Sequence, residues 1–151
     1  MANHVLFRTS VMMAVVHAAA MLTWGTCWYV APFLSWVYVI GVLLSLLNHG
    51  WTSAWYVWVD RLWMVLGCMA DWYHMQRVCR GSECGALLAL QISLIGSFVV
   101  AKIWVTRAAH GSAGNIPHMM MHFGGTMLHV LLLWKLGSFA GTIRFSDLWK
   151  L

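Results

Sequence analysis

The sequence predicts an all-α fold, a polytopic integral membrane bundle of about five transmembrane helices that forms a single domain over residues 1–151. Hydrophobic residues make up 62% of the chain and charged residues only 9%, against about 25% charged residues in an ordinary soluble domain. A soluble sphere of this size could not hide so much apolar surface. The net charge of +5 is too thinly spread to follow a nucleic-acid backbone. Composition therefore excludes soluble globular enzymes, disordered tails and nucleic-acid binders.

Five apolar runs of about 20 residues, the length that crosses a bilayer, define the layout. We expect spans at about 11–30, 32–49, 51–70, 86–105 and 117–137. The runs are too long and too uniformly apolar for the strands of a membrane barrel, so they should be helices. The chain has two prolines, Pro32 and Pro117, and both stand where a span should begin, which suits a first helical residue. The first run is interpreted as a span and not as a cleaved secretory signal.

Polar segments separate the runs. The most polar loop is expected at 71–84, where Cys79 and Cys84 could form a disulfide, or a metal site together with His74. A second loop is expected at 106–116. Seven of the eleven tryptophans fall near predicted span ends, where an indole prefers to lie. Counting Lys and Arg places the C-terminus on the cytoplasmic or matrix side.

Ionisable groups at membrane depth are costly, so each one inside a predicted span is a functional hypothesis. Asp60 is the only acid in this position. Its structural alternative is an ion pair with Arg61, but adjacent residues on a helix point about 100° apart, which makes that pair poor. The histidines inside predicted spans are His17, His49, His118, His122 and His129.

The three histidines of the fifth run share one helix face. His118 and His122 are four residues apart, which places them about 40° apart around a helix, and His129 falls between them in angle. An i, i+4 histidine pair is a ready bidentate metal site. The alternative is that hydrogen-bonded histidines hold neighbouring helices together.

Counting membrane crossings brings residues of different runs to one level. His49 ends the second run, and His118 and His122 begin the fifth, so all three should lie near the same face of the membrane. Asp60 should lie roughly 14 Å into the third run, and Ser45 one turn deeper than His49 on the same helix. Three imidazoles, a carboxylate and a serine can then converge. These are the side chains that an open catalytic zinc site requires.

Three motifs resemble those of the CREST superfamily, which includes alkaline ceramidases and progestin and adiponectin receptors. That family carries Ser-x3-His near the end of its second span, an Asp opening the third and His-x3-His on the last. The chain departs from the family in having five runs instead of seven and no acidic calcium-binding stretch near its start. Trp63 also stands where bacterial members usually have Pro. The matching motifs are Ser45-x3-His49, Asp60-x-Leu62-x-Met64 and His118-x3-His122.

The CREST resemblance implies a function and a role for each motif residue. His49, His118 and His122 would bind zinc, Asp60 would hold or activate the metal-bound water, and Ser45 would stabilise the oxyanion. The chain would be a zinc-dependent, ceramidase-like lipid amidohydrolase. Zinc would lower the pKa of the water toward 7 and polarise the carbonyl, in a pocket that lipid enters sideways.

A second resemblance is to the membrane-anchor subunits of succinate dehydrogenase. His49-x10-Asp60 is similar to their His-x10-Asp, in which the His ligates haem b and the Asp lies near quinone. The anchors have Tyr after this Asp, where the chain has Arg61, and three spans each. In this interpretation two histidines on different helices would sandwich the haem iron. The candidate pairs are His49 with His118 and His17 with His129.

A third interpretation is structural. Chain ends normally fray unless something holds them, so two ordered ends in a membrane protein of 17.1 kDa would suggest neighbouring subunits. The chain would then be an accessory or anchor subunit of a larger, respiratory-type membrane complex, with or without a bound metal. Its partners would be membrane lipids and other subunits. Its location would be an organelle membrane, either the mitochondrial inner membrane or the endoplasmic reticulum.

Overall fold

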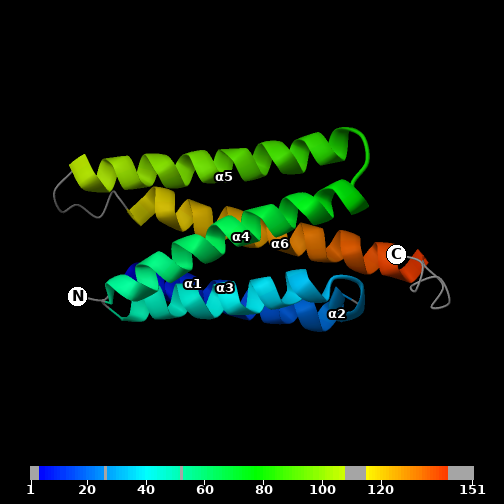
Figure 1. The fold of residues 1–151 in the computed structure, drawn as a ribbon, viewed down its shortest axis with the longest axis horizontal. Helices are drawn as coiled ribbons and strands as arrows, with labels where there is room; N and C mark the ends of the chain where they lie inside the picture. The colour runs from blue at the N-terminus through cyan, green and yellow to red at the C-terminus, as the bar shows by residue number, and fades with distance from the viewer. Residues whose placement is uncertain (1–3, 26, 52, 108–114, 143–151) are drawn as a thin grey trace.

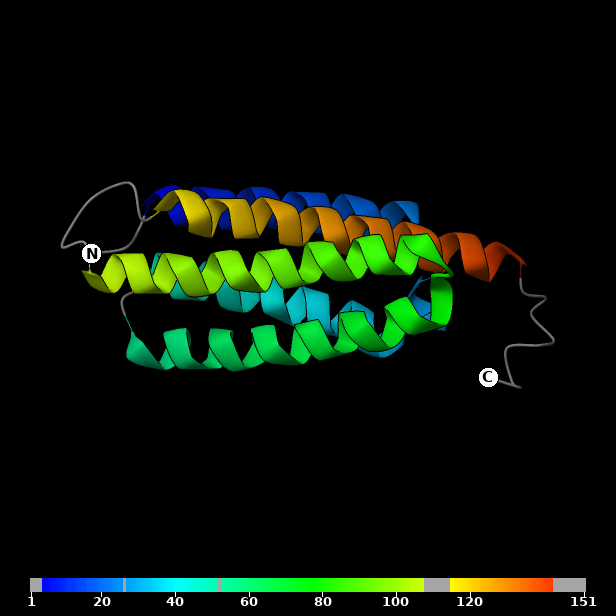
Figure 2. The same cartoon turned by 90° about the horizontal axis from the view of Figure 1, so that it is seen from above.

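The computed structural model describes residues 4–25, 27–51, 53–107 and 115–142, and this part of the chain is helical without any strand. The long helices run along one common axis and form an elongated bundle (Figure 1, Figure 2). The centre of the expected 106–116 loop and both chain ends, on which the accessory-subunit interpretation draws, lie outside the described ranges. In chain order the helices are α1 (His4–Thr23), α2 (Cys27–Val30), α3 (Pro32–Gly50), α4 (Ala54–Val78), α5 (Ser82–Arg107) and α6 (Asn115–Thr142).

Four of these helices are long and apolar enough to cross a membrane, and the all-α class predicted from the sequence is confirmed. The four segments are His4–Thr23, Pro32–Gly50, Ser82–Val100 and Ile116–Ser138. The first begins seven residues earlier than the expected span at 11–30. The expected third span, now part of α4, is not among the four.

Proline marks the starts of α3 and α6 as expected. Pro32 is the first residue of α3, where its missing N–H removes no helical hydrogen bond. Helix α6 starts at Asn115, so Pro117 lies within its first turn instead of opening it. Both prolines therefore stand where backbone N–H groups have no partner inside the helix.

The loop expected at 71–84 is wrong in extent, because α4 continues to Val78 and α5 begins at Ser82. Asp71 and His74 are buried instead of facing water, and Asp71 contacts Tyr38 of α3 and His129 of α6. Because its partners lie on neighbouring helices, a charged residue such as Asp71 can be buried within α4, and the helix continues past it. The turn that remains is made by Gly81, whose φ of 60° favours glycine.

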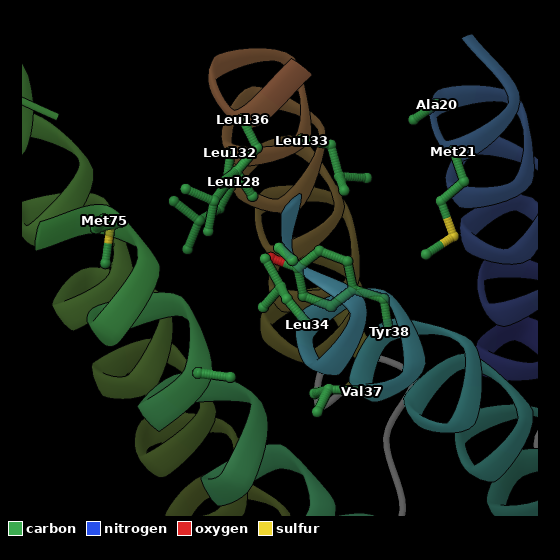
Figure 3. Packing of buried hydrophobic residues seen from close by; sticks show 12 residues of the cluster. Ala20, Met21, Leu34, Val37, Tyr38, Met75, Leu128, Leu132, Leu133 and Leu136 are labelled. Atoms are coloured by element: carbon green, nitrogen blue, oxygen red, sulfur yellow. The ribbon is translucent and has the colours of Figure 1, made fainter. Parts of the chain in front are cut away.

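The core forms where α1, α3, α4 and α6 meet. Helix α6 is central, since it packs against α1 and α5 and also contacts α4. Figure 3 shows its leucines turned toward Leu34 and Tyr38 of α3, with Met75 of α4 and Met21 of α1 on either side. The four core leucines of α6 are Leu128, Leu132, Leu133 and Leu136.

Buried polar groups tie the helices together at fixed registers. The indole Nε1 of Trp63 on α4 donates to the carbonyl of Val37 on α3 at 2.8 Å. The amide of Gln91 on α5 donates to the carbonyl of Cys68 on α4 at 3.0 Å. Hydrogen bonds of this kind fix how neighbouring helices lie along one another, in addition to the packing of their apolar side chains.

Replacing a core leucine of α6 should destabilise the bundle. Leu132 is fully buried, so Leu132→Ala leaves a cavity and should lower the free energy of unfolding by about 2–5 kcal/mol. Leu62→Ala is the matched control, because Leu62 is 69% exposed on α4. Thermal unfolding of both variants in one detergent measures the effect. Equal melting temperatures for the two would contradict this core.

Candidate metal centre

Three histidines from two helices converge at one end of the bundle. His49 lies in the last turn of α3, and His118 and His122 lie in the first two turns of α6. One possible ligand atom from each histidine lies within 4.8 Å of the other two. The ring centroids are 5.0 Å apart for His49 and His118, 5.2 Å for His49 and His122, and 4.9 Å for His118 and His122. The structure therefore brings together the three histidines that the crossing count places at one level.

The chemistry and spacing of these imidazoles suit a zinc ion. Zinc–nitrogen bonds of about 2.0–2.1 Å in a tetrahedral site set the nitrogens roughly 3.3 Å apart. Closing from 4.8 Å to that spacing needs movements of about 1.5 Å at most, within reach of side-chain rotation. Three neutral nitrogens leave the fourth position of the metal open for a water or a substrate atom. This buried group could hold a metal ion.

Thr9 of α1 sets the tautomer of His122. The Thr9 hydroxyl donates to the carbonyl of Leu6 at 2.9 Å, which uses its single hydrogen. Its Oγ1 lies 2.9 Å from Nδ1 of His122, so Nδ1 is the donor in that contact. Nε2 of His122 then keeps its lone pair for a metal. Nothing in the sequence singles out Thr9, because one hydroxyl in an apolar run carries no spacing signal.

Ser45 lies one turn below His49 on α3, as expected, and its hydroxyl is directed toward α1. Its Oγ is 3.0 Å from Oγ of Ser10. Ser10 donates its hydrogen to the carbonyl of Leu6 at 3.0 Å, so Ser45 is the donor between the two serines. To serve an oxyanion, Ser45 would have to turn away from Ser10.

Asp60 is buried beside the end of α3 that carries His49. The side-chain amide of Asn48, the neighbour of His49 in the chain, donates to Oδ2 of Asp60 at 2.7 Å. The guanidinium carbon of Arg61 lies 5.5 Å from the ring centroid of Trp58, in a cation–π contact. The carboxylate of Asp60 therefore points into the bundle, whereas the guanidinium of Arg61 lies over the indole ring of Trp58.

A lateral groove leads to His122 from the flank of the bundle. It has a volume of about 270 Å³ and lies between α1 and α6. Its lining includes the polar residues Thr9, His122 and Thr126 and the apolar residues Met12, Phe123 and Met127. An apolar chain could thus approach the histidine centre from the flank of the bundle.

His17 and His129, the other candidate haem pair, lie away from this centre. His129 is seven residues beyond His122 on α6, a separation of about 10 Å along the helix. Nε2 of His17 is 2.8 Å from Nδ1 of His129. Two metal–nitrogen bonds of about 2 Å on opposite sides of an iron need roughly 4 Å. A haem at this pair therefore requires the rings to separate, and it stays a prediction.

The cysteines of the short α4–α5 turn are free thiols. Cys79 is buried, whereas Cys84 is half-buried in the first turn of α5. Burial raises the pKa of the Cys79 thiol, and Cys84 and Glu83 nearby add to this shift. In the part of the chain that the structure describes, the metal-ligating group that forms is the histidine centre, not one that combines His74 with these cysteines.

Comparison with known proteins adds no relative. No family model, no curated protein and no solved structure matches the chain. The resemblances to the CREST superfamily and to the succinate dehydrogenase anchors therefore rest on the motif residues alone.

Removing the Thr9 hydroxyl should weaken metal binding without removing a ligand. In Thr9→Val, Nδ1 of His122 loses its acceptor, so the Nε2 lone pair is no longer fixed toward the metal. We expect the Kd for zinc to rise about 10–100-fold, as for other residues that orient a metal ligand. Competition with a chromogenic chelator measures this Kd. Thr9→Ser keeps the hydroxyl and should bind as the wild type does; unchanged zinc affinity in Thr9→Val would refute the role given to Thr9.

Proposed function

We propose that this chain is an integral membrane protein that binds zinc at His49, His118 and His122 and hydrolyses a lipid amide. The observation that carries the proposal is the convergence of three imidazoles from α3 and α6. The order of the motif residues, which resembles that of the CREST superfamily, supports the same reaction class.

We also propose that α4 crosses the membrane, which makes five spans. The two buried acids of α4, Asp60 and Asp71, face the bundle, which removes the main cost of placing this helix in lipid. Its opposite face is an apolar stripe at the spacing of helical turns. The stripe consists of the exposed residues Trp55, Trp58, Leu62, Val65, Met69 and Trp72.

Each polar residue of the centre has a role in this proposal. When bound, a zinc ion would supply an activated water and polarise the amide carbonyl. Asp60, which Asn48 holds in place, takes the proton of the attacking water and returns it to the leaving amine. Ser45 turns from Ser10 and donates its hydroxyl hydrogen to the carbonyl oxygen. The α1–α6 groove receives the acyl chain, so the amide arrives at the His122 side of the centre.

Zinc content and hydrolysis, measured on the same preparations, test the proposal. The purified full chain should hold one zinc ion and cleave an N-acyl sphingoid base in mixed micelles. His118→Ala should lose both properties. Asp60→Asn should keep the metal and lose about 10²–10⁴-fold in rate, because only proton transfer is removed. His4→Ala, which replaces an exposed histidine at the start of α1, should change neither.

Other outcomes would favour the other two interpretations. A Soret band in place of zinc would overturn the proposal in favour of a haem-binding anchor subunit. Neither metal nor haem, together with co-purification in a fixed complex, would favour an accessory subunit. Zinc at wild-type level in His118→Ala would show that the metal binds elsewhere.

A further inference from the structure

A second polar cluster lies at mid-bundle and takes no part in the proposed hydrolysis. It joins His17 of α1, Tyr38 of α3, Asp71 of α4 and His129 of α6. His17, Tyr38 and Asp71 are at most 3% exposed. The contacts form one chain: the Tyr38 hydroxyl donates to Oδ1 of Asp71 at 2.5 Å, Oδ2 of Asp71 is 3.2 Å from Nε2 of His129, and Nδ1 of His129 is 2.8 Å from Nε2 of His17.

The direction of two hydrogen bonds in this chain follows from one fixed acceptor. Nδ1 of His17 lies 2.8 Å from the carbonyl oxygen of Met13, and a carbonyl only accepts, so this nitrogen carries a hydrogen. In neutral His17 the other ring nitrogen, Nε2, is then an acceptor. Nδ1 of His129 must therefore donate to it.

The contact between His129 and Asp71 then requires one further proton. With its hydrogen on Nδ1, neutral His129 presents a lone pair at Nε2, and an ionised Asp71 presents only acceptors. A proton must lie between them, either on Oδ2 of Asp71 or on Nε2 of His129. Both placements give the cluster a net charge of zero, which suits its burial.

We propose that Asp71, His129 and His17 form a proton relay that operates across the bundle from α4 to α1. The proton on Oδ2 of Asp71 moves to Nε2 of His129, while Nδ1 of His129 gives its proton to Nε2 of His17. The products are an Asp71 carboxylate and a His17 imidazolium, and no other reactant is needed. The relay thus leaves a negative charge on α4 and a positive charge on α1.

Neighbouring side chains fix the orientation of the relay residues. The ring of Tyr38 stacks on His129 with centroids 4.0 Å apart and planes at 20°, which fixes the plane of the central imidazole. Cys68 and His74 are further titratable groups of α4 that lie near Asp71, and Arg77 lies near His74. The buried group facing α4 from α5 is Gln91, which is neutral and is engaged with the Cys68 carbonyl.

The variant Asp71→Asn distinguishes a proton relay from a set of hydrogen bonds that only holds the helices together. An asparagine can accept from Tyr38 through its oxygen and donate to Nε2 of His129 through its nitrogen, so it keeps both hydrogen bonds. It cannot release a proton. A purely structural role tolerates this exchange, whereas a relay does not.

Nitrogen NMR on the full chain in lipid nanodiscs, labelled with ¹⁵N-histidine, tests the relay. In the wild type we expect the ring nitrogens of His17 to show signals averaged between neutral and imidazolium positions, and those of His129 to show signals averaged between the Nδ1–H and Nε2–H tautomers. In Asp71→Asn both rings should show the neutral Nδ1–H tautomer. A wild-type His17 ring that shows only the neutral Nδ1–H tautomer would overturn the proposal, because the proton would then stay on Asp71 or on His129.

His17→Gln provides a second test if Asp71→Asn fails to fold. The glutamine oxygen can still accept from Nδ1 of His129 but cannot take its proton, so the averaging of the His129 signals should cease. His129 signals unchanged from the wild type would overturn the relay. Zinc content should stay unaltered in this variant, so failure of the relay and failure of the metal centre are distinguished.

Discussion

The structure depends on one constraint: a polar side chain that is buried between the helices must find its partner inside the bundle. Helix α4 shows the consequence most clearly. Asp60 is held by Asn48, and Asp71 is held by Tyr38 and His129, all from neighbouring helices. The face turned away from these contacts is a stripe of tryptophans and aliphatic side chains. Polar contacts thus orient the helix, and the apolar stripe is turned away from the bundle.

These contacts lie at two levels along one face of α6. His122 belongs to the metal centre and His129, seven residues further, to the mid-bundle chain. Seven residues are close to two helical turns, so both rings point toward α1. Thr9 and His17 of α1 meet them at the same two levels. Beyond the second level the buried side chains of α6 are leucines, and the packing at that end of the bundle is apolar.

Much of this arrangement could be predicted from the sequence, but some of its partners could not. The apolar runs and Pro32 predict the helices, and counting crossings brings His49 level with the pair on α6. The sequence predicts a loop at Asp71, because a charge at the end of an apolar run looks solvent-exposed until Tyr38 and His129 are found beside it. Thr9 leaves no pattern either, since its role depends on the packing of α1 against α6.

X-ray absorption at the zinc edge, recorded on the purified full chain, tests the central claim most directly. If the imidazoles of α3 and α6 share one ion, the spectrum should fit three histidine nitrogens and one oxygen ligand at about 2.0–2.1 Å. A sample without zinc, or one whose zinc has sulfur ligands, would contradict the account.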